Sequence, residues 1–552
     1  KNNVKWSIDG ALKMYLDGSD LVLNGDSTAF SIKDADGTET ARLATASGDQ
    51  GLLYLRGPTG GNAIYLDGNG SSYFNGGNVG IGTTSPDAGA ELTILGKVYQ
   101  DVGSSGAGNV NYGSGSFAHT SGLSNYGGSY STGIGFETLK TLSGNAHRNT
   151  AVGYRAMYGD STGIEGTDNT AVGASSMLNI KDGQYNVAMG VNAAAGITDG
   201  LSNTAIGVNA LQSSTTANYN TVMGVNALKT NVDGDYNTAI GYQSMLNYEP
   251  GDGEGYNVAI GAESLLSGTT GQKNIAIGYY SLWRTTTGDN NVAVGNEAGR
   301  SMYSTASGGA NNVFVGYRAA YYGTHASGAV AIGYRAGRDF GYNNAAEGNT
   351  AVGYQSGFNT TNAENVTLVG ALAGAAHSHG NYSTAVGVNA LYGISGQTSG
   401  YNTAIGAGAM RYASGSQYNV AIGDKALSGA STGLSGDSNV AIGRQAMVSA
   451  TTARDNTVIG TQAGQYMTTA LENVAIGYLA GRSITAGNYN TVIGWWAGYD
   501  LTSSHRNTFV GYASGKQYNQ TGDGYNVALG MYSMQNVETG SSNVAIGYTA
   551  LA

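Results

Sequence analysis

Hydrophobic and polar positions repeat in a fixed order along most of this chain. From residue 133 to residue 552 the motif Asn, Thr or Val, Ala, Ile or Val, Gly recurs, and neighbouring glycines are often 17 residues apart, as from Gly207 to Gly224. Alignment of the chain on that glycine gives 24 copies, and 15 of the 23 intervals are 17 residues long. Such a short period is typical of a solenoid, in which one copy cannot bury its apolar face alone.

We number each copy from its Asn as position 0, so that the glycine is position +4. The positions that we expect to define the structural repeat are those two, as in Asn186 and Gly190, Asn203 and Gly207, Asn220 and Gly224, and Asn237 and Gly241. Positions +1 and +3 are β-branched or aliphatic, and +2 is usually Ala, which predicts a short strand. We expect +1 and +3 to fill the core. The small residues at +2 and +4 would then form a flat outer face on which another backbone packs closely.

The period sets the size of one coil. At about 3.3 Å per residue, 17 residues supply two short strands and two turns, which predicts an all-β solenoid of about 24 coils forming a narrow parallel β-roll. Stacked coils would place each Asn above the last, either for a hydrogen-bonded ladder or because Asn tolerates a left-handed turn. The longer intervals, such as 247–256 and 303–311, are expected to bulge as loops without breaking the ladder.

The core of one coil is small, which bears on the oligomeric state. A coil of this length encloses about four or five side chains, little for a long rod. The flat face at +2 and +4 and the small residue at +7 would let three rolls pack around an axis. We therefore predict a homotrimer, with a monomeric solenoid as the alternative.

Residues 1–100 follow a different pattern. Short alternating runs, among them residues 12–16, 20–23, 52–55 and 63–66, are separated by Asp-Gly, Asn-Gly and Gly-Gly turns. These runs predict strands of a slender β-rich shaft or connector built from three chains. Residues 101–132 are rich in Gly and Ser and read either as a linker or as capping coils of the rod in 133–552.

Two stretches resemble known families. The Asn-Val-Ala-Ile-Gly core, as at Asn257 to Gly261, resembles the head repeat of trimeric autotransporter adhesins, which implies a left-handed parallel β-roll that trimerises. The segment from Gly77 to Pro86, Gly-Asn-Val-Gly-Ile-Gly-Thr-Thr-Ser-Pro, resembles one that is common in bacteriophage tail-fibre proteins. The second resemblance implies a virion tail fibre or appendage that attaches to the host cell. The first implies, as an alternative, a bacterial surface adhesin.

Composition narrows the class of protein. The chain has 91 Gly, 3 Pro, no Cys and 11% charged residues, which is typical of a fibrous β protein whose stability owes nothing to disulfides. Its net charge of −11 argues against a nucleic-acid partner. No run of 18 apolar residues suggests insertion into a membrane. The expected partners are two further copies of the chain, other virion tail or baseplate proteins on the N-terminal side, and a host glycan or protein receptor.

The sequence contains little that points to catalysis. No catalytic residue and no cofactor site can be singled out, and we expect no enzyme, although a polysaccharide-degrading tailspike stays open. His377 and His379 are weak metal candidates, because one His-x-His from each chain of a trimer could surround an axial ion. Tyr recurs at positions −1 and +5, where stacked rows would strengthen packing. Trp495, Trp496 and Tyr512 are the candidate glycan contacts.

Overall fold

The computed structural model describes residues 109–113, 116, 129–143, 145–159, 163–250, 253–302, 309–342, 346–376, 380–394 and 399–552, together with the backbone of ten strands between residues 5 and 94. The chain divides into two compact units, Lys1–Gln100 and Asp101–Ala552. Every element of the described chain is a strand or a turn. The predicted all-β class is confirmed.

The first unit contains small sheets formed within one chain. A three-stranded antiparallel sheet contains β1 (Lys5–Ile8), β2 (Leu12–Asp17) and β3 (Asp20–Asn24). A five-stranded antiparallel sheet contains β4 (Ala29–Lys33), β5 (Glu39–Ala46), β6 (Gln50–Arg56), β7 (Asn62–Asp67) and β8 (Tyr73–Phe74). A parallel pair is formed by β9 (Val79–Ile81) and β10 (Leu92–Ile94). The four runs predicted as strands are β2, β3, β6 and β7. A shaft of three chains stays a prediction.

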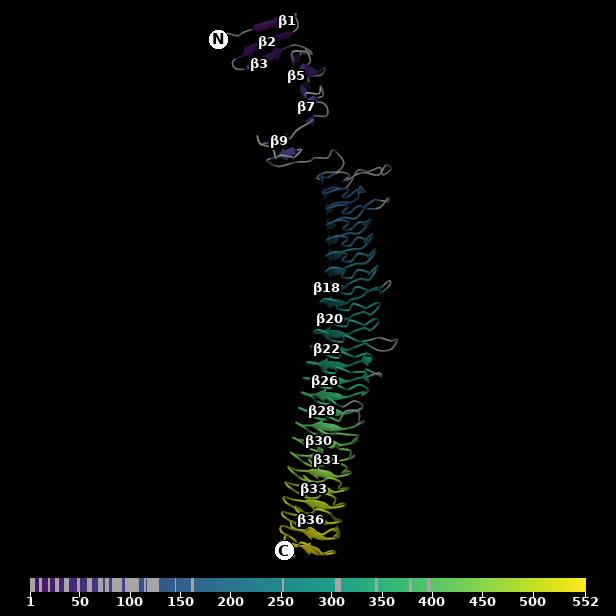
Figure 1. Ribbon diagram of the computed structural model, residues 1–552, viewed down its shortest axis with the longest axis vertical. Helices are drawn as coiled ribbons and strands as arrows, with labels where there is room; N and C mark the ends of the chain where they lie inside the picture. The colour runs from purple at the N-terminus through teal and green to yellow at the C-terminus, as the bar shows by residue number, and fades with distance from the viewer. Residues whose placement is uncertain are drawn as a thin grey trace. The chain divides into compact units, whose positions relative to one another are not determined.

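The second unit is a parallel β-solenoid (Figure 1). One three-residue strand per coil pairs with the strand of the next coil, always with +1 opposite +1, so that 25 strands form a single sheet. Its strands, in order, are β11 (Val110–Tyr112), β12 (Thr132–Ile134), β13 (Thr150–Val152), β14 (Thr170–Val172), β15 (Val187–Met189), β16 (Thr204–Ile206), β17 (Thr221–Met223), β18 (Thr238–Ile240), β19 (Val258–Ile260), β20 (Ile275–Ile277), β21 (Val292–Val294), β22 (Val313–Val315), β24 (Val330–Ile332), β26 (Thr350–Val352), β27 (Thr367–Val369), β28 (Thr384–Val386), β29 (Thr403–Ile405), β30 (Val420–Ile422), β31 (Val440–Ile442), β32 (Thr457–Ile459), β33 (Val474–Ile476), β34 (Thr491–Ile493), β36 (Thr508–Val510), β38 (Val527–Leu529) and β39 (Val544–Ile546). Two shorter parallel pairs join β23 (Ala326–Ser327) to β25 (Ala346–Glu347) and β35 (Ser504–His505) to β37 (Gly522–Asp523).

The Asn at position 0 forms a buried ladder along the rod. The backbone N–H of Asn203 donates to Oδ1 of Asn186 at 2.9 Å, its Nδ2 donates to the same oxygen at 3.0 Å, and Nδ2 also donates to the carbonyl of Ala217 at 2.7 Å. None of the described Asn residues at position 0 has a positive φ, whereas the preceding residue often does, as at Tyr219 with φ 57°. The ladder, and not a left-handed turn, therefore explains the repeated Asn.

Longer intervals leave the ladder intact, as predicted. The N–H of Asn257 donates to Oδ1 of Asn237 at 3.1 Å across a 20-residue interval, and the N–H of Asn312 donates to Oδ1 of Asn291 at 3.1 Å across 21 residues. Residues 251–252 and 303–308 of these intervals lie outside the described residues, so the ladder is confirmed here and the bulging of the two loops stays a prediction.

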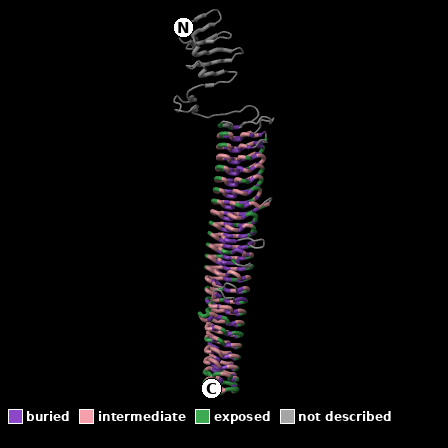
Figure 2. Tube along the Cα trace, turned by 45° about the vertical axis from the view of Figure 1, so that its right-hand side comes forward, coloured by how far each residue is buried: buried purple, intermediate pink, exposed green. Residues whose placement is uncertain are grey.

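The predicted orientation of the strand is wrong. Ala at +2 is the inward residue, and Ala205 is 0% exposed, whereas Met189 and Met223 at +3 are 47% and 46% exposed. Alternation gives the period of a strand but not which of its two faces is buried. Position +2 also points inward where it is larger than Ala, as at Phe314, which is 0% exposed, and the side chains at +1 and +3 lie outside. In Figure 2 buried residues recur along the rod.

The glycine at +4 also packs differently from the prediction. Gly224 has a φ of +141°, and a Cβ added to it would lie 2.7 Å from the carbonyl carbon of Gly241, the same position in the next coil. Glycine is needed because side chains are strained at this φ and because neighbouring backbones stack there. The flat surface thus packs against the next coil of the same chain.

One large side chain per coil often fills the remaining core, from either of two positions. In some coils +8 is large and +11 is small, as at Leu211 and Ser214. In others +8 is glycine and +11 is large, as at Gly337 and Phe340, where a Cβ on the glycine would lie 2.6 Å from the ring. In a third group both positions are large and buried, as at Met245 and Tyr248.

Candidate functional site

The outward face of the long sheet is free of charge. In all 24 copies position +1 is Thr, Val or Ile and position +3 is Ile, Val, Met or Leu. These residues are half-buried or exposed, and the exposed fraction of Ile405 is 38%. We call this surface the sheet face.

The sheet face is large for a surface left in water. Twenty-four coils at about 4.8 Å span about 115 Å, and the +1 and +3 columns lie about 7 Å apart, so the strip covers on the order of 800 Å². The largest apolar patch on a typical monomer is about 300–600 Å². The strip carries no charge over its whole length, and its +3 column is apolar throughout.

Rows of tyrosine border the sheet face. At position −1 the rings of Tyr219, Tyr236 and Tyr256 stack with centroids 4.9 and 5.0 Å apart. At +5 the ring of Tyr334 stacks at 5.4 Å on Tyr317 and at 5.3 Å on Tyr354. The rows provide the cross-coil packing expected of them, and one side of many rings is still exposed.

The candidate glycan contacts Trp495, Trp496 and Tyr512 lie together on two adjacent coils. The centroid of Trp495 is 6.0 Å from that of Trp496 and 6.1 Å from that of Tyr512, and Trp496 and Tyr512 are 6.0 Å apart. Trp495 is 52% exposed. The three rings form a continuous apolar surface, which we call the tryptophan cluster.

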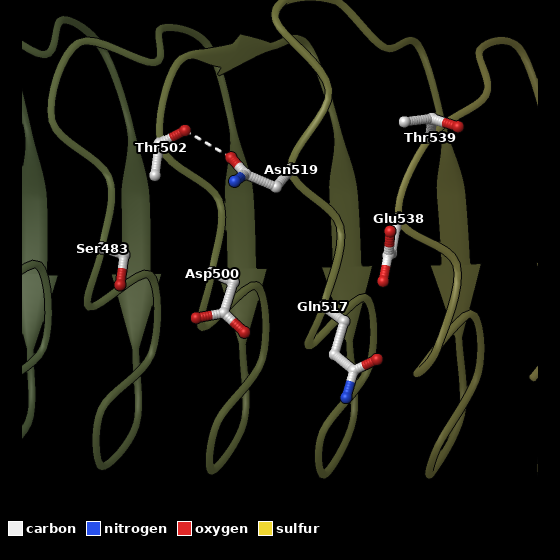
Figure 3. Close-up of a pocket in the computed structure, with 7 residues that line it drawn as sticks. All are labelled: Ser483, Asp500, Thr502, Gln517, Asn519, Glu538 and Thr539. Atoms are coloured by element: carbon white, nitrogen blue, oxygen red, sulfur yellow. Dashed lines mark hydrogen bonds between the residues drawn. The ribbon is translucent and has the colours of Figure 1, made fainter.

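A polar groove occupies neighbouring positions of the same coils, with a volume of about 560 Å³, within the usual range for ligand sites. It is lined by Ser483, Asp500, Thr502, Gln517, Asn519, Glu538 and Thr539 (Figure 3). Sequence reasoning missed this groove, because its side chains come from positions +10 to +13, where residue identity varies from coil to coil and only Thr at +12 recurs. Their alignment appears only when the coils are stacked.

Burial and nearby cations determine the electrostatics of the groove. Burial raises the pKa of Asp500, and the charges of Lys516 and then Arg482 oppose that shift. Nζ of Lys516 lies 4.6 Å from the ring centroid of Trp496, so this lysine joins the groove to the tryptophan cluster. The Arg482 guanidinium donates to the Tyr499 hydroxyl at 2.7 Å. The two cations are thus held by aromatic rings beside a partly buried carboxylate.

The other sequence candidates are placed as follows. His377 and His379 lie outside the described residues, and no three described His, Asp or Glu side chains gather as a metal site would require. The Asn residues of the repeat lie inside the coils, and each glycine at +4 stacks on the corresponding glycine of the next coil. A search for membrane-spanning helices among the described residues found none that is sufficiently long and apolar.

Comparison with known proteins adds no relative: no family model, no curated protein and no solved structure matches this chain.

Proposed function

We propose that the protein is a structural fibre component of a virion, a phage tail fibre or appendage, in which three copies form a rod that carries host attachment. The observation that carries this proposal is the sheet face, which is uncharged along all 24 copies and has an apolar residue at +3 in each. Folding of a single chain does not require that pattern, because the core is filled from +2, +7, +8 and +11.

A second and third copy of the chain are the partners that fit the sheet face best. A partner must be as long as the solenoid and must present the same uncharged surface at every coil, and another copy in parallel register does both. The edges at −1 and +5 differ in composition, which suits a cyclic contact in which the −1 edge of one copy meets the +5 edge of the next. Three copies would bury the edges as well as the centre.

The segment from Gly77 to Pro86 favours a virion over a cell surface as the location of the fibre. Its resemblance to tail-fibre proteins is independent of the repeats. The Asn-Val-Ala-Ile-Gly repeats support the alternative, a bacterial surface adhesin of the trimeric autotransporter type. Both functions predict a trimeric rod, and they differ in where the protein is found.

Two measurements test this proposal. Light scattering or sedimentation of the purified chain should give three times 56.1 kDa, and negative-stain images should show a uniform rod. A monomeric mass at micromolar concentration would contradict the trimer. Antibody labelling of purified virions from the source should decorate an appendage, whereas labelling only of bacterial cell surfaces would favour the adhesin.

A further inference from the structure

We propose that the groove lined by Ser483, Asp500, Thr502, Gln517, Asn519, Glu538 and Thr539 binds a neutral, hydroxyl-rich glycan chain that lies along the rod. This inference rests on the proposed attachment function and names its ligand class and its site. It moves the centre of recognition from the tryptophan cluster to the polar surface beside it.

The groove is built for an extended ligand. Ser483, Asp500 and Gln517 occupy position +10 of three consecutive coils, so they form a row with a spacing of about 4.8 Å. Thr502, Asn519 and Glu538 form a second row at position +12. Two parallel rows of hydrogen-bonding groups present repeated contacts to a polymer, whereas a compact ligand would use only one or two coils. Figure 3 shows both rows.

The groove begins where a row of threonine hydrogen bonds at position +12 ends. At position +12 of earlier coils, threonine hydroxyls donate to the backbone carbonyl one coil on, as from Thr468 to Thr485 at 3.1 Å and from Thr485 to Thr502 at 3.2 Å. The hydroxyl of Thr502 instead donates to the side-chain oxygen of Asn519. This contact orients the Asn519 amide so that its NH₂ group is available as a donor.

The groove offers acceptors and donors that suit hydroxyl groups. Within residues 399–552, which the structure describes without a gap, no side chain donates a hydrogen bond or forms an ion pair with the Asp500 carboxylate. Two vicinal hydroxyls of a sugar can donate to such a carboxylate, and the amides of Gln517 and Asn519 both donate and accept. Trp496, joined to the groove through Lys516, adds an apolar ring for the C–H face of a sugar.

Charge selects a neutral polymer. Asp500 and Glu538 would repel an anionic chain, and the net charge of the protein is −11. Lys516 and Arg482 lie beside Asp500 and balance the charges of the two carboxylates, so the groove itself offers no net charge to hold a polycation. A glycan without charge meets no repulsion and needs no net charge.

The test uses the intact purified chain in its native oligomeric state. Binding is measured by interferometry to immobilised dextran, mannan and β-glucan as neutral probes, to heparin as an anionic probe and to chitosan as a cationic probe. We expect binding to at least one neutral polymer and none to heparin or chitosan. Failure of all three neutral probes, or binding to the charged probes alone, overturns the proposal.

Variants locate the binding. Asp500→Asn and Gln517→Ala should each weaken binding of the neutral glycan by about tenfold, with no loss of melting temperature. The matched control is Asn179→Ala, a polar residue exposed at the same +10 position of a distant coil. Equal binding by wild type and both groove variants overturns the proposal. If the protein is a trimer but binds no glycan, only the proposal for the groove is refuted. If it is a monomer that binds glycan through Asp500, only the proposal of a trimeric fibre is refuted.

Discussion

The inward and outward positions of the coil repeat with the same period, but different contacts explain them. Inside, Asn at 0, Ala at +2 and Gly at +4 are fixed by contacts with the next coil of the same chain. Outside, +1 and +3 are equally regular but fill no space within the chain. The repeat therefore encodes two interactions, one that stacks coils and one that we assign to neighbouring chains. Substitutions at matched positions can separate them.

The largest effect is expected from Gly224→Val. A valine at this site would adopt a strained φ of +141° and overlap the backbone of Gly241, which should cost roughly 3–6 kcal/mol of unfolding free energy. Chemical denaturation followed by circular dichroism measures the loss. Gly547→Val is the matched control, because Gly547 has a similar φ of +122° with nothing within 4 Å of an added Cβ. Equal losses at the two sites would show that strain, and not stacking, explains the glycine.

Removal of one member of the ladder should have the next largest effect. Asn203→Ala keeps the backbone N–H bond to Asn186 but removes four side-chain hydrogen bonds: two that its Nδ2 donates, to Asn186 and Ala217, and two that its Oδ1 accepts from Asn220. Loss of these buried bonds should cost about 3 kcal/mol. The control is Asn209→Ala, in a half-exposed row where its Nδ2 donates to Asn226 at 3.0 Å. We expect a loss below about 1 kcal/mol there. A smaller loss at Asn203 than at Asn209 would contradict the ladder as the main stabilising feature.

Substitutions in the outward +1 and +3 columns should disrupt the trimer and leave the fold of each chain intact. Lysine at Met189, Met223 and Ile240 together would place three charges per chain on the sheet face without entering the core. The solenoid should keep its circular dichroism spectrum, while the mass falls from a trimer to 56.1 kDa. A trimer that survives these three substitutions would show that the sheet face is not the interface. The control is Val225→Thr at the exposed edge, which should leave both properties unchanged.

Much of the fold could be predicted from the sequence, because a period of 17 residues leaves few ways to stack a β-coil. Neither the orientation of the strand nor the groove could be predicted. Alternation of Thr204, Ala205 and Ile206 gives two faces, but the local pattern does not decide that the face with Ala205 is the buried one. The groove combines Asp500, Gln517 and Glu538, which are separated by 17 or more residues and share no motif. Local patterns identify what every coil has in common and miss what a few coils build together.

The smallest effect is expected at Asp500, a residue of the groove whose charge does not stabilise the fold. Burial raises the pKa of Asp500 above its ordinary value of 3.8, so the folded protein binds this proton more tightly than the unfolded chain does. Asp500 therefore favours folding at low pH, and this contribution is lost as the pH rises through the raised value. Asp500→Asn should be slightly more stable than wild type at neutral pH, with the difference vanishing below the ordinary value.

The pKa of Glu137, another carboxyl on the outside of the rod, is shifted in the opposite direction to that of Asp500. Hydrogen bonds from Lys140 and then Arg155 lower the pKa of its carboxyl below 4.5, so it stabilises the fold above that value and loses this contribution as the pH falls through the lowered one. Glu137→Gln should then be less stable than wild type at neutral pH, and thermal melts across pH 3–7 compare the two variants. The charged form of Asp500 destabilises the fold, so stability does not explain why an aspartate occupies this position. Ligand binding does explain it. If Asp500→Asn proves less stable than wild type at neutral pH, the carboxylate serves the fold and that argument for a ligand is lost.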